Sequence, residues 1–258
     1  MAIHPTALVD PRARVAQSAE IGPYCVVGAE VEIGAGTRLA AHVYVEGPTW
    51  IGEENLFFPY STVGVASQDL KYQGERAETR IGHRNKIREF VTIHRGTEGG
   101  GALTSIGDDD LLMAYVHVAH DARIGNHVVL ANGATVGGHV TVGDWAVVGA
   151  FTGLHQFCRV GRHAMIGGYS VVTQDVLPFS MTVSERQIKT FGANRVGLER
   201  RGFPKETIEG LHRAFRLLGR SGLNTAQAVQ RMREEIPAFQ ELEELLEFIC
   251  GSERGVIK

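Results

Sequence analysis

Residues 106–172 read IGDDDLLMAYVHVAHDARIGNHVVLANGATVGGHVTVGDWAVVGAFTGLHQFCRVGRHAMIGGYSVV, and an aliphatic residue returns at every sixth position of this stretch. These positions are, in chain order, Ile106, Leu112, Val118, Ile124, Leu130, Val136, Val142, Val148, Leu154, Val160, Ile166 and Val172. A period of six fits neither a helix of 3.6 residues per turn nor a simple two-sheet sandwich. It is typical of a solenoid in which each short strand ends at a corner.

The same period covers the N-terminal part of the chain, from Ile3 to Val63 and again from Ile81 to Ile93. Glycine often follows the aliphatic residue, and a small residue often stands four places after it, as Cys25 and Cys158 do. Three hexapeptides close one triangular coil, with the aliphatic side chains inside and the small residues in the corners. We therefore predict a parallel β-helix over residues 1–190. The high glycine content also leads us to expect many tight backbone turns.

Two polar, glycine-bearing segments interrupt the repeat, at residues 65–80 and 95–105. The first has Asp69 and Glu75 where aliphatic residues are due, and the second shifts the register by one residue. Insertions in repeat proteins often lie on a binding face. We expect both segments to project as loops, with the stronger case for a binding role in the first. The alternative is that they are merely tolerated insertions.

The period becomes helical after about Arg195, so we predict a helical domain over residues 191–258. One predicted helix begins near Pro204, a second follows Asn224 as its N-cap, and a third covers 241–249. The residues that share one face of the first of these helices are Ile208, Leu211, Phe215 and Leu218. Residues 195–220, the first part of this helical domain, hold seven basic and three acidic side chains. This positive surface fits an acidic partner; the alternative is that the charged side chains form ordinary solvated helix faces.

Composition excludes several other classes of protein. The net charge of -3 gives no electrostatic case for nucleic acid as the main partner. Three cysteines are too few and too scattered for a disulfide framework or a cysteine-based zinc site. We expect no membrane span, because no run of about 18 apolar residues occurs. The first residues do not resemble a secretory signal, so we expect a cytoplasmic protein.

Eleven histidines are present, and the coil predicts where several of them meet. Positions separated by three hexapeptides should lie in neighbouring coils, about 4.7–4.9 Å from each other. The pairs brought together in this way are Gly138 with His120, His139 with Asp121, and His155 with Gly137.

This cluster contains the parts needed for acyl transfer. A neutral His120 can take a proton from an alcohol that attacks an acyl carbonyl. Asp121 can hold the imidazole in the required tautomer, and the Gly138 N–H can donate to the developing oxyanion. No Ser or Cys stands beside His120 at a matching phase, which favours direct transfer without an acyl-enzyme. We predict His120, Asp121 and Gly138 as catalytic residues; the alternative is a surface histidine cluster without function.

A zinc site is a competing hypothesis. Some hexapeptide β-helices resemble the gamma-class carbonic anhydrases, in which three histidines from two chains hold zinc and two of them stand five positions apart. No two histidines of this chain have that separation, although His117 and His120 are close enough in sequence to chelate weakly. We therefore expect no metal and no other cofactor.

Several motifs, in order and over the whole chain, resemble one family. They are HPTALVD (4–10), SQDLKYQGE (67–75), IREFVTIHRGT (87–97), HVAHD (117–121), LANGATVGGHVTV (130–142), LHQFCRVG (154–161) and FGANRVGLERRGF (191–203). The chain is identified by them as a member of the acyl-(acyl-carrier-protein)–UDP-N-acetylglucosamine O-acyltransferases, the first enzymes of lipid A synthesis. The repeat alone is unspecific, because many acyltransferases share it.

The resemblance implies a left-handed β-helix, a homotrimer with sites between chains, and a reaction. In that reaction the 3-hydroxyl of UDP-N-acetylglucosamine attacks the thioester of an (R)-3-hydroxyacyl-acyl carrier protein. His120 matches the base, Asp121 its partner and Gly138 the oxyanion donor. The resemblance also implies that the acidic carrier protein binds the arginine-rich first predicted helix.

The resemblance further implies substrate contacts. Asp69 and Lys71 match groups near the sugar and the acyl chain, and Gly168 falls where side-chain bulk sets acyl length, so that a glycine favours a longer chain. The further matches are His117, His139, His155 and Gln156 for other substrate contacts, and Asn194, Arg200 and Arg201 for the nucleotide and its phosphates, where arginine offers a fork for diphosphate oxygens.

One segment departs from the family. Its members usually carry a Gly-Asn pair before FGANR, whereas this chain has SERQIKT at 184–190. The sequence therefore leaves the identity of the acceptor sugar open, since some members of the family act on a 3-amino sugar and form an amide. Two further alternatives are a hexapeptide acyltransferase that uses acyl-CoA, and a repeat scaffold that binds a nucleotide sugar without chemistry.

Overall fold

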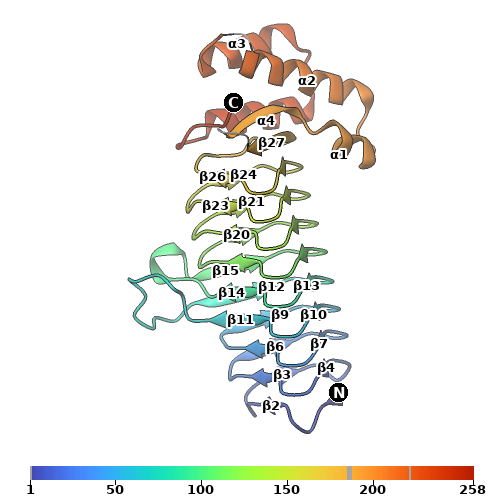
Figure 1. The fold of residues 1–258 in the computed structure, drawn as a ribbon, viewed down its shortest axis with the longest axis vertical. Helices are drawn as coiled ribbons and strands as arrows, with labels where there is room; N and C mark the ends of the chain where they lie inside the picture. The colour runs from blue at the N-terminus through green and yellow to red at the C-terminus, as the bar shows by residue number, and fades with distance from the viewer. Residues whose placement is uncertain (1, 185–187, 221) are drawn as a thin grey trace.

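The computed structural model describes residues 2–184, 188–220 and 222–258, and their strands form a left-handed parallel β-helix with α-helices at one end (Figure 1). Three parallel sheets run along the column, one on each face of a triangular coil. The N-terminus lies at the opposite end from the helices (Figure 1). The fold class predicted from the six-residue period is confirmed.

Each face of the coil is one sheet of short strands. The first sheet contains β1 (Ala2–Ile3), β4 (Glu20–Ile21), β7 (Arg38–Leu39), β10 (Leu56–Phe57), β13 (Lys86–Ile87), β16 (Leu111–Leu112), β19 (Val129–Leu130), β22 (Val147–Val148), β25 (Met165–Ile166), β27 (Ser180–Ser184) and β28 (Ile188–Ala193). The second contains β2 (Leu8–Val9), β5 (Val26–Val27), β8 (Tyr44–Val45), β11 (Thr62–Val65), β14 (Thr92–His94), β17 (His117–Val118), β20 (Thr135–Val136), β23 (Gly153–Leu154) and β26 (Val171–Val172). The third contains β3 (Arg14–Val15), β6 (Val31–Ile33), β9 (Thr49–Ile51), β12 (Glu78–Ile81), β15 (Leu103–Ile106), β18 (Arg123–Ile124), β21 (Thr141–Val142) and β24 (Arg159–Val160). All neighbours pair in parallel except β27 and β28, which form an antiparallel pair.

The strand register shows where the repeat is interrupted. Ile3 pairs with Ile21, three hexapeptides later, as expected for a regular coil. Ile51 pairs with Ile81 and Ile81 with Ile106, so both of these coils are longer than three hexapeptides, and the first is the longer of the two. The additional residues form two loops, 66–77 and 95–102, which project from the same side of the column (Figure 1). The second loop contains a short 3-10 helix, η1 (Glu98–Gly100).

The inward aliphatic residues form a continuous core. Ile21, Val63 and Leu130 are buried, and the same is true at most positions of the period. The first coil is less well covered: Ile3 has 37% of its surface exposed, and Val9 and Val15 are partly buried. At the other end Ile257, close to the C-terminus, joins the same core.

The corners of the coil are tight turns, as the glycine content led us to expect, but most of them do not contain glycine at their left-handed position. The left-handed corner residue stands three places after the aliphatic residue, and it is usually not glycine, as at Tyr24 (φ 57°), Asp121 (φ 59°) and Trp145 (φ 62°). Glycines stand directly after the aliphatic residue, where successive coils come closest. A Cβ on Gly34 would lie 2.5 Å from the Gly52 carbonyl oxygen, which no side chain allows. The glycines therefore permit close stacking of the coils.

In the described part of the chain, four α-helices follow the coil and share a second core. They are α1 (Arg195–Arg200), α2 (Lys205–Arg220), α3 (Thr225–Glu235) and α4 (Gln240–Cys250). The predicted apolar face of α2 is buried in this core. Asn224 caps α3 in a capping box with Gln227, as the sequence predicts. The predicted domain division after residue 190 falls inside β28, and it remains a proposal.

A buried polar ladder crosses three coils at one corner. The Asn85 N–H donates to Asn55 Oδ1 (2.9 Å), and the Asp110 N–H donates to Asn85 Oδ1 (2.7 Å). Both asparagines also donate from Nδ2 to a carbonyl of the next coil, at Gly82 and Gly107 respectively. Asp110 accepts from the Val128 N–H through Oδ1, but its buried Oδ2 has no partner. Burial raises the pKa of Asp110 to about 8, so the aspartic acid is largely protonated near neutral pH.

Replacing Asp110→Asn should make the protein more stable at alkaline pH. The folded pKa of about 8 lies above the ordinary value of 3.8, so this stabilisation is complete below about pH 4 and is lost as the pH rises to 8. Wild type should lose up to about 1.4 kcal/mol of unfolding free energy per pH unit from this group, and the variant should not. Urea unfolding between about pH 5 and pH 8 measures this; parallel pH dependence of the two proteins would contradict it.

Candidate active site

A cavity of about 520 Å³ lies where the first projecting loop meets the second sheet. Its histidines come from β14, β17 and the corners that follow β17 and β20. The residues that line it are Gln68, Asp69, Leu70, Lys71, His94, His117, Ala119, His120, His139, Gln156 and Phe157. The cavity therefore brings together six of the residues predicted to bind or react with substrate, His120 among them.

His120 and Asp121 form a hydrogen-bonded pair at one corner of the coil. His120 Nδ1 lies 2.8 Å from Asp121 Oδ2, and the Asp121 side chain is completely buried. An ionised carboxylate only accepts hydrogen bonds, so Nδ1 carries the proton and Nε2 keeps its lone pair. His120 is thus held as the tautomer that can act as a base through Nε2.

Asp121 is the left-handed residue (φ 59°) at its corner of the coil. The second loop then covers it, because the Thr97 N–H and hydroxyl both donate to its carboxylate. Its own N–H donates to the hydroxyl of Thr104 (2.7 Å). Sequence reasoning assigned no role to Thr97 or Thr104, although Thr97 ends the quoted motif IREFVTIHRGT.

Gly138 lies against the His120 ring. A Cβ at this position would lie 2.6 Å from His120 Nε2 and 2.7 Å from Cε1. The N–H groups on either side of it are bonded, from Gly137 to Leu154 and from His139 to His120. Within the described part of the chain the Gly138 N–H donates to no acceptor, so this donor is free beside the base.

Three further histidines surround His120. His139 meets it edge-to-face at 5.0 Å between ring centroids, and His94 meets His117 in the same way. Burial lowers the pKa of His94 to about 4, and it also lowers the pKa of His117 and His139; repulsion from neighbouring histidines acts in the same direction. These rings are therefore neutral near pH 7 and leave His120 in surroundings of low positive charge. His94 was missed from the sequence, because its place depends on the length of the second loop.

The first loop brings a carboxylate to the open side of His120. Asp69 Oδ2 lies 3.9 Å from His120 Nε2. Asp69 Oδ1 accepts from the Lys71 N–H (3.0 Å), and Ser67 Oγ accepts from the Asp69 N–H (3.1 Å). These local hydrogen bonds shape the loop. Lys71 is exposed, so its ammonium group is available to a ligand.

Other predicted site residues lie elsewhere on this chain. His155 bonds the Gln156 carbonyl, contacts Arg254 and does not line the cavity. Asn194 is buried and caps α1, while its amide donates to the His163 carbonyl (3.1 Å). Arg201 donates to the Trp145 carbonyl (3.1 Å).

These residues are divided among the three corners of the coil. His120, Gly138 and Gln156 belong to the corner of Asp121, and Gly168 packs against Ala150 at a second corner. Arg201 contacts the third corner through Trp145, and Arg200 is exposed. One chain alone does not bring the three groups together.

The side chains that could hold a metal ion are those of the same cluster. Among the described residues, one group of three has ligand atoms within 4.8 Å of each other, namely His120, Asp121 and His139. The Asp121 oxygens already accept hydrogen bonds from Thr97 and His120, which suits an orienting carboxylate. The expectation that no metal is needed remains a prediction.

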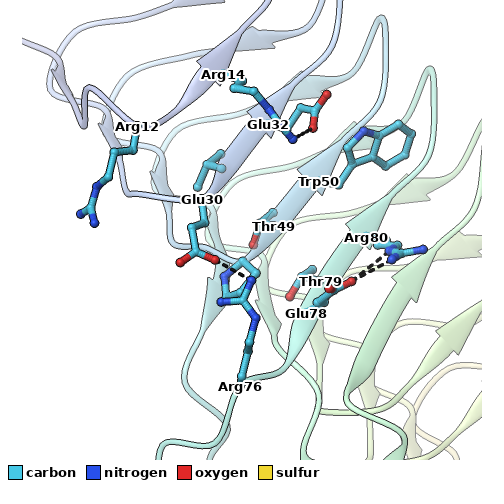
Figure 2. Close-up of a pocket in the computed structure, with 12 residues that line it drawn as sticks. Arg12, Arg14, Glu30, Glu32, Thr49, Trp50, Arg76, Glu78, Thr79 and Arg80 are labelled. Carbon is cyan, nitrogen blue, oxygen red and sulfur yellow. Dashed lines mark hydrogen bonds and ion pairs between the residues drawn. The ribbon is translucent and has the colours of Figure 1, made fainter.

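A second groove lies away from this cluster, on the outer face of β6, β9 and β12 (Figure 2). It has a volume of about 600 Å³ and contains none of the predicted site residues. Its arginines are neutralised by carboxylates, in the pairs Arg12–Asp10, Arg14–Glu32, Arg76–Glu30 and Arg80–Glu78. This groove therefore offers little free charge to a ligand.

Among the described residues, no helix has the length and apolar character to cross a membrane. Two family models match the chain. One, described as Udp N-acetylglucosamine O-acyltransferase; Domain 2, matches residues 175–257. The other, described as bacterial transferase hexapeptide (six repeats), matches residues 104–138.

Curated proteins and solved structures resemble the whole chain. The acyl-(acyl-carrier-protein)–UDP-N-acetylglucosamine O-acyltransferase of Thermodesulfovibrio yellowstonii is 48% identical over 256 residues, 99% of each chain. The protein of that name from Xanthomonas axonopodis pv. citri is 46% identical over 99% of this chain and 97% of its own. LpxA from Acinetobacter baumannii superposes with a TM-score of 0.96 at 44% identity and covers 100% of both chains. LpxA from Bacteroides fragilis 9343, a UDP-N-acetylglucosamine acyltransferase, superposes with a TM-score of 0.97 at 39% identity and covers 99% of this chain and 100% of its own.

Replacing Gly138→Ala should displace the His120 ring and weaken its hydrogen bond to Asp121, because the new methyl group would overlap Nε2. Histidine-labelled NMR should show the loss of the low-field Nδ1 proton signal of His120. Gly153→Ala is the matched control, since a Cβ there meets nothing within 4 Å. An unchanged His120 signal in the Gly138 variant would contradict the close packing.

Proposed function

Because the chain belongs to the acyl-(acyl-carrier-protein)–UDP-N-acetylglucosamine O-acyltransferase family, we propose that it acts by direct transfer with His120 as the general base. The enzyme moves an acyl chain from acyl carrier protein to UDP-N-acetylglucosamine, the first step of lipid A biosynthesis. In our proposal the acyl chain is an (R)-3-hydroxyacyl group and the acceptor is the 3-hydroxyl of the sugar.

The observation that carries this mechanism is the packing of His120 between Asp121 and Gly138. Asp121 sets the proton on Nδ1, which leaves Nε2 free to accept a proton. The Gly138 backbone packs against the His120 ring beside Nε2, and its N–H donates to no acceptor within the described part of the chain; we assign this N–H to the reacting carbonyl oxygen. Base and oxyanion donor thus come from adjacent coils.

The step balances without a cofactor. The sugar hydroxyl oxygen forms a bond to the thioester carbonyl carbon while His120 Nε2 takes the hydroxyl proton. The negative charge on the carbonyl oxygen is held by the Gly138 N–H. When the tetrahedral intermediate collapses, the carbon–sulfur bond breaks and the imidazolium returns the proton to the thiolate of the carrier protein.

Direct transfer is supported by the composition of the cavity. None of the side chains that line it within the described chain is a serine or a cysteine. Cys158 is buried, and burial raises the pKa of its thiol, which makes it a poor nucleophile. An acyl-enzyme is therefore not part of the proposal.

We also propose that the active enzyme is a homotrimer. The residues assigned to the base, to acyl length and to the nucleotide lie at three different corners of the column. Only a neighbouring chain can bring a second corner to the His120 cavity, and this supports sites between chains. In that arrangement the substrate contacts around His120 come from Asp69, Lys71, His117, His139 and Gln156, and His155 lies at the edge of the site. The acyl chain is contacted by Gly168, and the nucleotide by Asn194, Arg200 and Arg201.

The acidic carrier protein is proposed to dock on α2. A cavity of about 750 Å³ between β28 and α2 is lined by Arg213, Arg216, His212 and Lys258, with Glu209 as the acidic residue. Burial, and to a lesser extent the nearby arginines, lower the pKa of His212, so the charge of this surface comes from the arginines and the lysine.

A cytoplasmic location also remains a prediction.

The departure from the family pattern concerns the acceptor sugar. This departure covers 184–190, and residues 185–187 lie outside the described residues. The 3-amino sugar, acyl-CoA as donor and binding without chemistry are therefore outcomes of the test below.

Acyl transfer from 3-hydroxyacyl-acyl carrier protein to UDP-N-acetylglucosamine should fall ~10²–10⁴-fold in His120→Ala, because general base catalysis is worth about that much. Turnover is measured by mass spectrometry of the acylated sugar, and the oligomeric state by light scattering. His4→Ala, an exposed histidine near the first strand, should behave like wild type.

The donor and acceptor are varied in the same assay. Wild-type turnover with the 3-amino sugar alone would replace the acceptor, and turnover with acyl-CoA alone would replace the donor. Full activity of His120→Ala would overturn the base assignment, while no turnover by wild type with any pair would favour a binding protein.

A further inference from the structure

The Asp121 carboxylate accepts hydrogen bonds from the second projecting loop as well as from His120 of its own coil. The Thr97 N–H donates to both carboxylate oxygens, at 3.0 and 3.1 Å, and the Thr97 hydroxyl donates to Oδ2 at 2.6 Å. Thr97 is itself 7% exposed. A buried carboxylate needs such donors to stay ionised, and one residue of the loop supplies them through two groups.

The loop backbone also lies directly on this carboxylate. A Cβ on Gly100 would overlap Cγ and both oxygens of Asp121, and a Cβ on Gly96 would lie 2.8 Å from Oδ1. The loop closes on Thr97, whose carbonyl accepts from the N–H groups of Gly100 (3.0 Å) and Ala102 (2.8 Å). The carboxylate therefore sits in a rigid cradle formed by residues 96–102.

The same oxygen serves both the loop and the base. Oδ2 accepts from the Thr97 hydroxyl and from His120 Nδ1, so the hydroxyl fixes the direction in which Oδ2 faces the imidazole. If the carboxylate rotated, His120 would lose both its orientation and its tautomer.

We propose that Thr97 is a positioning residue for the transfer reaction, acting through Asp121 on His120, and that Gly96 and Gly100 of the second loop are required for this contact. The inference rests on the proposed role of His120 as the base. It gives the second loop a function in catalysis, beyond its position beside the cavity.

The first experiment compares Thr97→Val, Thr97→Ser and the exposed control Thr141→Val. Thr97→Val keeps the size of the side chain and removes the hydroxyl, so kcat should fall about 10- to 100-fold, as for a hydrogen bond to a charged group. KM for both substrates should change less than about threefold, because no substrate contact is removed. Thr97→Ser should restore most of kcat, and Thr141→Val should match wild type.

The pH profile separates positioning from a structural effect. Without the hydroxyl, Oδ2 keeps more negative charge for the imidazole, which favours the protonated ring, so the acid limb of kcat/KM should move to higher pH. The other titratable or charged groups around His120, which this variant leaves in place, are Asp69, Lys71, His94, His117 and His139. An unmoved limb with normal kcat, or a loss that serine does not rescue, would overturn the proposal.

A second pair of variants protects the test against misfolding of Thr97→Val. Gly100→Ala should lower kcat like Thr97→Val, because its methyl group enters the cradle. Gly99→Ala, one residue away, should have no effect, since a Cβ there meets nothing within 4 Å. Thermal unfolding and light scattering confirm that each variant is folded, and equal activity of the two would contradict the cradle.

Failure of this proposal is distinguishable from failure of the function. If His120→Ala keeps full activity, the base assignment is wrong whatever Thr97 does. If His120→Ala is impaired while Thr97→Val and Gly100→Ala turn over like wild type, only the positioning role is wrong.

Discussion

Parallel backbone hydrogen bonds between successive coils determine where His120 and Gly138 lie relative to each other. Each short strand bonds the strand one coil away, so a residue is fixed beside the one that stands three hexapeptides later in a regular coil. The spacing of paired strands, about 4.7–4.9 Å, is too small for side chains at the points of closest approach, and glycines occupy them. His120 and Gly138 use this geometry directly, since each belongs to its own coil and the stacking presses them together.

The two insertions add what a regular coil lacks. A coil alone presents side chains on flat faces and corners, with little enclosed volume. The first loop encloses His120 and brings Asp69 to within 3.9 Å of Nε2, and the second buries the Asp121 carboxylate under its own backbone. Burial also keeps the neighbouring histidines neutral, as the lowered pKa of His94 shows. The base is therefore provided by the repeat, while its surroundings are provided by the interruptions.

The sequence predicted those parts of the structure that obey the period. The coil, the contact of His120 with Gly138 and the apolar face of α2 all follow from regular spacing, and the structure contains them. The path of the second loop follows no period, so the cover over Asp121 and the place of His94 could not be deduced. Asn194 shows another limit: resemblance assigns it to a nucleotide, while here its side chain caps α1 and bonds the distant His163. The glycine content led us to expect tight turns, whereas many of the glycines stand directly after the aliphatic residue and permit the close approach of successive coils.

The exposed first coil has a consequence for how such a protein can change in evolution. Ile3 is partly uncovered at the end of the column, and the coils beneath the loops contact the His120 cavity only through the coils above them. If one whole coil of three hexapeptides were gained or lost at this end, the column would become longer or shorter and would end in a similar exposed coil. No distance around His120 would change. The length of the column and the chemistry it carries are thus inherited separately, which a globular domain with one closed core does not allow.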